Sequence, residues 1–135
     1  MNKPVNRQFR TSVIVMIAVV VIVLLASVLS TIAWKPCGVS QDENGIIVHL
    51  NIKDIVIPAE EIDSIVPYPA KSHTIRLCGI GTRSVKVGLF QNEQIGKFDC
   101  YVTTFSNAVV IYRKDKRPVV VSVDDPEIWK EYYKN

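Results

Sequence analysis

The sequence predicts a membrane-anchored, mainly β protein. An N-terminal transmembrane α-helix precedes one small domain of about seven antiparallel strands, a sandwich or partly open barrel closed by a C-terminal amphipathic helix. Three observations lead to this prediction. An uncharged apolar run near the N-terminus is long enough to cross a bilayer. Short runs of alternating apolar and polar residues follow it, separated by turn residues. The last residues change to helical spacing behind a helix-start signal.

The composition is that of one folded domain without a marked charge bias. The chain has 135 residues, of which 48% are apolar, enough to build one modest core. Its 16 Lys and Arg exceed its 13 Asp and Glu, and Lys3, Arg7 and Arg10 supply the whole excess. Residues 11–135 are therefore neutral overall. This argues against a nucleic-acid partner, since such proteins present a basic face.

Residues 11–34 form the predicted transmembrane helix and carry no charge. As a helix the run would be roughly 36 Å long, against a bilayer core of about 30 Å. Trp34 and Lys35 are suited to the membrane interface. We expect an uncleaved signal anchor, because a cleaved signal peptide has a shorter apolar stretch, although residues 31–33 resemble a cleavage site. A lipoprotein signal is disfavoured, since Trp, Lys and Pro precede Cys37.

Basic residues near the two ends of this run predict its orientation. The N-terminal side carries three, whereas the C-terminal side has Lys35 and then none until Lys53. The positive-inside rule therefore predicts a cytoplasmic N-terminus and an extracytoplasmic domain. The predicted boundaries are a cytoplasmic tail at 1–10, the anchor at 11–34, a polar linker at 35–45 and the domain at 46–135.

Alternation and turn residues predict the strands of the domain. These are expected at 46–53, 55–57, 64–68, 74–77, 84–91, 97–104, 108–113 and 118–123, with a helical-looking turn before 64, a turn at 92–96 and a charged hairpin at 114–117. Gly79 and Gly81 interrupt a strand-like run, which indicates a bulge or a close backbone approach. Gly88 lies within a strand, where its missing side chain allows close packing.

The C-terminus reads as a short amphipathic helix. Asp125 fits the N-cap, Pro126 the first helical position and Glu127 the first turn. Ile128, Trp129 and Tyr132 then share one face. Because so short a helix must dock on the sheet, we expect Trp129 to plug the open end of the sandwich.

An ordered set of short pieces runs through the soluble part from about Ile57 to Tyr133. These are Ile57-Pro58, Glu61-Ile62-Asp63-Ser64-Ile65, Arg76, Gly79, Gly81, Val87-Gly88-Leu89-Phe90, Gly96, Phe98, Tyr101 and Asp124-Asp125-Pro126-Glu127. At this spacing they resemble a bacterial pleckstrin-homology (PH) domain family found in small membrane-anchored proteins. Seven strands capped by a C-terminal helix is the PH arrangement. A shared fold does not carry a ligand with it, so the resemblance leaves the partner open.

No catalytic or metal-binding constellation is visible in the sequence. The glycines at 79 and 81 precede a strand-like run, whereas a phosphate-binding loop would precede a helix. His49 and His73 lie near no recognisable nucleophile motif and are interpreted as incidental. The three cysteines, Cys37, Cys78 and Cys100, are too scattered for a zinc site. We therefore predict no enzyme, no metal and no cofactor.

The cysteines bear on the compartment as well. One disulfide is possible in an extracytoplasmic domain. However, a hairpin centred near Glu93 would place Cys100 opposite Lys86 rather than Cys78. Buried free thiols are therefore the favoured interpretation for Cys78 and Cys100.

Two groups of basic residues are candidates for binding a small anionic ligand or a lipid head group: Arg76, Arg83 and Lys86, and Arg113, Lys114, Lys116 and Arg117. The second group forms a charged hairpin, which is usually solvated and guards a sheet edge. The favoured function is therefore a non-catalytic module that binds a protein partner or itself while residues 11–34 hold it in the bilayer. Recognition of an anionic ligand is the alternative.

Overall fold

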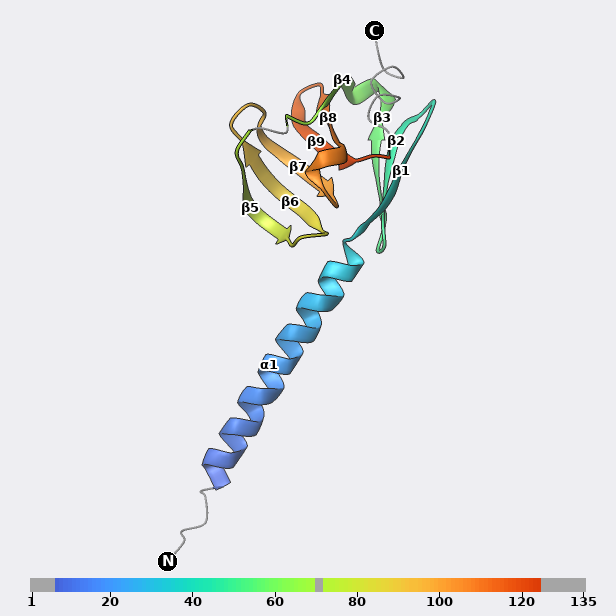
Figure 1. Ribbon diagram of the computed structural model, residues 1–135. Coiled ribbons are helices and arrows are strands. Elements are labelled where there is room, and N and C mark those ends of the chain that lie inside the picture. Colours follow the sequence, from blue (N-terminus) through green and yellow to red (C-terminus); the bar gives the residue numbers. More distant parts are fainter. Residues whose placement is uncertain (1–6, 70–71, 125–135) are drawn as a thin grey trace, which may run out of the picture. The chain divides into compact units, whose positions relative to one another are not determined.

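The computed structural model describes residues 7–69 and 72–124, and the chain divides into two compact units, Met1–Ile32 and Ala33–Asn135. Figure 1 shows the helix and the β domain that make up these units. The predicted C-terminal helix, including Trp129, lies outside the described residues.

The helix α1 (Arg7–Ala33) includes all residues of the predicted anchor except Trp34, and its residues up to Ile32 belong to the first unit. None of its residues is buried, and its length and composition suit a membrane span. The hydroxyls of Thr11, Ser27 and Thr31 donate to carbonyls four residues earlier, at 2.8, 2.8 and 2.9 Å. These three hydroxyls are thus satisfied within the helix, as a hydrocarbon environment requires.

The second unit contains two sheets. The three-stranded sheet is antiparallel and consists of β1 (Pro36–Asp42), β2 (Gly45–Leu50) and β3 (Asp54–Pro58). The six-stranded sheet has the order β4-β8-β9-β7-β6-β5. Its strands are β4 (Ile62–Pro67), β5 (Thr74–Gly81), β6 (Lys86–Asn92), β7 (Gly96–Val102), β8 (Ala108–Arg113) and β9 (Lys116–Ser122). Two short 3₁₀ helices, η1 (Ala59–Glu61) and η2 (Phe105–Asn107), connect strands.

The topology of the six-stranded sheet includes one parallel pair. β7 and β9 run parallel, with Asp99 opposite Val119 and Tyr101 opposite Val121, and all other neighbours are antiparallel. A parallel pair needs a crossover connection, and η2 with β8 provides it. Consequently β5 lies at one edge of the sheet and β4 at the other (Figure 1).

The mainly β architecture is as predicted, but the expected count of about seven strands is corrected to nine among the described residues. Eight of the nine strands correspond to the predicted runs, and the ninth comes from the segment 35–45, which the composition predicted as a linker. Its polar and glycine residues form β1 and a tight turn, in which the Asp42 carboxylate accepts from the amides of Asn44 and Gly45 at 2.8 and 3.2 Å. β1 pairs with β2, and its Val39 packs against the core.

Two buried clusters cover both faces of the central strands. The first cluster joins the two sheets: Ile46, Val48, Leu50, Ile57, Ile62, Ile65, Val109, Ile111, Val119, Val121 and Val123. The second occupies the opposite face of the six-stranded sheet: Tyr68, Phe90, Phe98, Cys100, Val102, Ala108, Val110 and Val120. Because successive side chains point to opposite faces, strands buried on both sides read as unbroken apolar runs. Val119-Val120-Val121 is such a run.

A pair of glycines lets β5 and β6 approach closely. Gly79 lies opposite Gly88, with φ values of 114° and 139°. A Cβ on Gly88 would lie 2.2 Å from the Cys78 carbonyl oxygen. The predicted close approach is therefore present. The strand does not stop at the glycines, however, but continues to Gly81 with a bulge between Arg76 and Cys78.

Asn92 ends β6 as a buried residue rather than as part of an exposed turn. Its side-chain amide donates to the hydroxyls of Tyr68 and Thr74 at 3.1 and 3.0 Å. Its carbonyl oxygen accepts from the backbone amides of Gln94 and Ile95. Asn92 thereby ties the β6–β7 turn to the segment that links β4 and β5, two parts of the chain far apart in sequence.

The register of β6 and β7 corrects the prediction for the cysteines. Cys100 pairs with Gly88, two residues from the expected Lys86. Cys100 is buried as predicted, whereas Cys78 is exposed because no described strand lies on the outer side of β5. Cys37, Cys78 and Cys100 are all free thiols.

Replacing Gly88 by Ala tests the close approach of β5 and β6. We expect the free energy of unfolding to fall by at least about 3 kcal/mol, since the new Cβ meets backbone that cannot move without breaking the strand pair. Gly96→Ala is the matched control, because Gly96 has φ 84° but nothing within 4 Å of a Cβ, so it should cost only about 1 kcal/mol. Urea unfolding of the full chain in detergent measures both, and equal losses would show that backbone conformation alone explains them.

Candidate functional site

The basic hairpin between β8 and β9 is engaged in ion pairs. Arg113 and Arg117 both reach the carboxylate of Asp99, at 3.2 and 3.1 Å. Lys116 contacts Glu61 at 2.5 Å. These contacts link the hairpin to β7 and η1. Three of the four residues proposed here for an anionic ligand therefore already have acidic partners, and only the exposed Lys114 shows no ion pair among the described residues.

The second basic group has no acidic ion-pair partner in the described part of the chain. Arg76, Arg83 and Lys86 form no ion pair with an acidic residue in the described ranges 7–69 and 72–124. Lys86 instead donates to the Arg83 carbonyl at 3.0 Å and lies 5.9 Å from the ring centre of Phe105. The Arg76 side chain extends along β5 towards Gly81. The two basic groups do not merge into one patch, because Lys86 pairs with the end of β7 and the hairpin lies beside its beginning.

In the described part of the chain, β5 is an edge strand without a neighbour on its outer side, and it carries exposed apolar side chains. Ile75 is 45% exposed and Leu77 is 42% exposed. An edge strand leaves alternate backbone N–H and C=O groups without a partner, so it is a template for a further strand. The bulge at 76–78 and the charge of Arg76 both hinder unselective pairing. An incoming strand with an acidic side chain opposite Arg76 would remove the hindrance that the charge of Arg76 causes.

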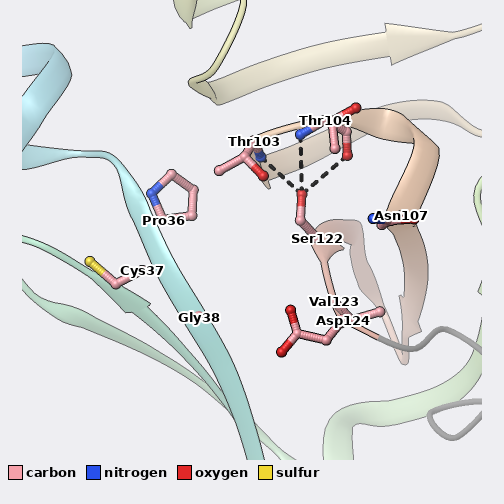
Figure 2. Close-up of a pocket in the computed structure, with 9 residues that line it drawn as sticks. All are labelled: Pro36, Cys37, Gly38, Thr103, Thr104, Asn107, Ser122, Val123 and Asp124. Atoms are coloured by element: carbon pink, nitrogen blue, oxygen red, sulfur yellow. Dashed lines mark hydrogen bonds between the residues drawn. The ribbon is translucent and has the colours of Figure 1, made fainter.

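A polar pocket of about 200 Å³ lies where the start of β1 approaches the end of β9. Its lining residues are Pro36, Cys37, Gly38, Thr103, Thr104, Asn107, Ser122, Val123 and Asp124 (Figure 2). The Ser122 hydroxyl accepts from the backbone amides of Thr103 and Thr104, at 2.9 and 3.5 Å, and donates to the Thr104 carbonyl. This hydroxyl therefore holds the corner after β7. The carboxylate of Asp124 at the rim makes the pocket unfavourable for an anion.

An apolar pocket of about 250 Å³ lies on the β5–β7 face of the sheet. It is lined by Trp34, Gly79, Ile80, Val87, Gly88, Asp99 and Tyr101. The glycine pair contributes no side chains to it. Burial, assisted by the nearby charge of Asp99, raises the pKa of Tyr101, so its hydroxyl stays neutral at physiological pH.

A row of Ser40, His49 and Asp54 crosses the three-stranded sheet. The Ser40 hydroxyl lies 2.8 Å from His49 Nε2, and His49 Nδ1 lies 2.9 Å from the Asp54 carboxylate. The sequence interpretation of His49 as incidental missed these contacts, because the three residues come from three strands and share no local motif. His49 pairs with Asp54 on β3 and with Gly38 on β1, two residues before Ser40. This register brings the three side chains together.

These hydrogen bonds follow the order found in serine hydrolases, but the surroundings differ. The side chains of His49 and Asp54 are 39% and 55% exposed, whereas a catalytic acid is buried and holds its histidine rigidly. Neither pocket described above includes any of the three residues. The row therefore acts as a polar cross-strand ladder on the outer face of the sheet. Within the described residues, no group of three His, Cys, Asp or Glu side chains could hold a metal ion.

A family model described as a bacterial PH domain matches residues 38–135. This chain belongs to the bacterial PH domain family. The predicted resemblance is thus confirmed. The matched range begins within β1, so it includes residues 38–45 of the segment 35–45 that the composition assigned to a linker. No curated protein and no solved structure matches the chain significantly.

We expect Ser40 not to react with a fluorophosphonate probe, which labels serine nucleophiles activated by a histidine. The reason is the solvent exposure of the row and the absence of any of its members from the described pockets. The measurement is mass spectrometry of the intact protein after treatment, with Ser40→Ala as the matched control. A covalent adduct that disappears in Ser40→Ala would show that the ladder is a hydrolytic site.

Proposed function

We propose that this bacterial PH domain is a membrane-anchored binding module without catalytic activity of its own. Its β5 edge takes an extended, acidic segment of another protein as an additional strand. The observation that carries the proposal is the combination of an open edge, two exposed apolar side chains on it and basic residues nearby without acidic partners.

The charge distribution favours an acidic partner over a second copy. Arg76, Arg83 and Lys86 lie on β5, in the turn after it and on β6, and none is neutralised within the described residues. A second copy would place the same charges against them, which destabilises strand pairing. An acidic strand would gain charge-assisted hydrogen bonds with the Arg76 guanidinium.

The anchor supports this function because it confines the domain to the surface of one membrane. A domain held by α1 meets partners of the same membrane at a raised effective concentration, so a weak strand addition is sufficient. The basic residues before the apolar run favour a cytoplasmic N-terminus and a domain outside the cytoplasm. A small anionic ligand or lipid head group is the second candidate, supported by the same three basic residues but without a pocket that gathers them.

Photo-crosslinking tests the β5 site directly. A photoreactive amino acid at Leu77 should give a protein adduct in the native host, whereas the same amino acid at Val56 should not. Val56 is the matched control, since it is 61% exposed on β3, another edge strand. Arg76→Glu should abolish the adduct, because it removes the charge that selects an acidic strand.

Lys114→Glu is the control for that reversal, since it makes the same change in net charge away from β5. Loss of the adduct in both variants would indicate a general effect of charge. An adduct with twice the mass of the chain would assign the edge to self-association instead. An adduct at Val56 but not at Leu77 would contradict the proposed site.

Thiol labelling in intact cells tests the orientation. We expect the exposed Cys78 to react with a membrane-impermeant maleimide without lysis. Cys100 should not react in the folded protein, because burial raises its thiol pKa from 9.0 to about 12 and also blocks access. The variant Cys37→Ser/Cys78→Ser, which keeps only Cys100, should be labelled only after denaturation. Labelling of Cys78 only after lysis would place the domain in the cytoplasm.

A further inference from the structure

The turn between β2 and β3 is bound to the residues at which α1 ends. The amide of Ile52 donates to the carbonyl of Ala33, the last residue of α1, at 2.9 Å. The amide of Asn51 donates to the Lys35 carbonyl at 3.2 Å. A third hydrogen bond, from Leu50 to the Lys53 carbonyl at 2.9 Å, closes the turn. The turn at 51–53 therefore lies next to the end of the apolar helix.

The side chains at this position combine an exposed apolar residue with an aromatic ring and cations. Ile52 is 58% exposed at the tip of the turn. The Lys53 ammonium lies 5.0 Å from the ring centre of Trp34, and Lys35 is also exposed. Apolar, aromatic and basic side chains together are typical of segments that lie in the membrane interface.

The hydrogen bonds limit how far this turn can be from the bilayer, whatever angle the domain takes. If α1 crosses the membrane, Ala33 lies near the boundary of the hydrocarbon core. The interfacial layer outside that boundary is about 6 Å thick on each side. An amide bonded directly to the Ala33 carbonyl keeps the backbone of Ile52 within this layer.

We propose that the β2–β3 turn is a second membrane contact, in which Ile52 enters the interface of the bilayer that α1 crosses while Lys35 and Lys53 bind anionic lipid head groups. The inference rests on the proposed membrane anchoring. The occupant of this surface is a lipid surface rather than a protein, because the turn is held by its backbone beside the end of the span and carries the basic charge that anionic lipids attract. The contact would hold the domain close to the membrane instead of letting it swing freely on the helix.

Spin-label accessibility in the full-length protein tests the contact. The protein is reconstituted in vesicles of phosphatidylcholine and phosphatidylglycerol, with Cys37 and Cys78 changed to Ser. Single labels are attached through Ile52→Cys, Val56→Cys or Val20→Cys, and accessibility to oxygen is compared with accessibility to a water-soluble nickel complex. Val56 is the matched control, because its exposure of 61% is close to that of Ile52 and it lies farther along the same hairpin.

We expect a ratio of oxygen to nickel accessibility at position 52 that is several times the ratio at 56, and that falls when phosphatidylglycerol is omitted. Position 20, in the middle of α1, should show the highest ratio. If 20 is immersed while 52 and 56 are equally accessible to nickel, the second contact is overturned and the anchor stands. If position 20 is itself accessible to nickel, α1 does not cross the bilayer, and both the proposed anchor and the second contact are overturned. Equal immersion of positions 52 and 56 would show that the whole hairpin, and not the turn alone, contacts the membrane. This result would also overturn the proposal.

Discussion

Burial of both faces of the central strands is the constraint on which this fold depends. β8 and β9 send alternate residues to one cluster between the two sheets and to another on the opposite face, whereas β7 buries its residues in the second cluster and packs only the partly buried Tyr101 against the first. Each buried Val, Leu, Ile or Phe side chain contributes roughly 1.5–3 kcal/mol relative to an exposed one. These strands must therefore lie in the interior of the sheet, which leaves β4 and β5 at its edges. The three-stranded sheet is needed to cover the first cluster, and this explains why the polar segment at 36–42 is drawn into a strand.

The same constraint distributes the charges. The hairpin at 113–117 lies next to Asp99 and Glu61, so its cations stabilise the connection of β8 and β9 to β7 and η1. Around β5, by contrast, Arg76, Arg83 and Lys86 form no ion pair with an acidic side chain among the described residues. Most cations of the hairpin have acidic partners within the domain, whereas those around β5 have none among the described residues. The cations around β5 are therefore the ones available to bind a partner. The function proposed for β5 follows from this difference rather than from the number of basic residues.

Local chemistry explains why the helix and the alternating strands could be predicted from the sequence. An uncharged run at 11–34 needs no partner to be recognised, and the strand at 108–113 has the boundaries that its apolar run predicts. The PH family was recognisable from short pieces at fixed spacing, and the family match confirms it. The turn at 92–96 lies where the sequence predicts it, but the burial of Asn92 was not predicted, because nothing near this residue in the sequence shows that its side chain is buried against Tyr68 and Thr74.

The sequence by itself determined the apolar N-terminal helix, the mainly β class and the family, since each depends on residues that are neighbours along the chain. Only the tertiary structure decided which strand is an edge, that Cys78 is exposed while Cys100 is buried, and that Asp99 forms ion pairs with both Arg113 and Arg117. It also decided that Ser40, His49 and Asp54 meet and that Ile52 lies beside Ala33. The physical reason is strand pairing. A register that joins distant segments is set by the burial of whole faces, and no single segment contains that information.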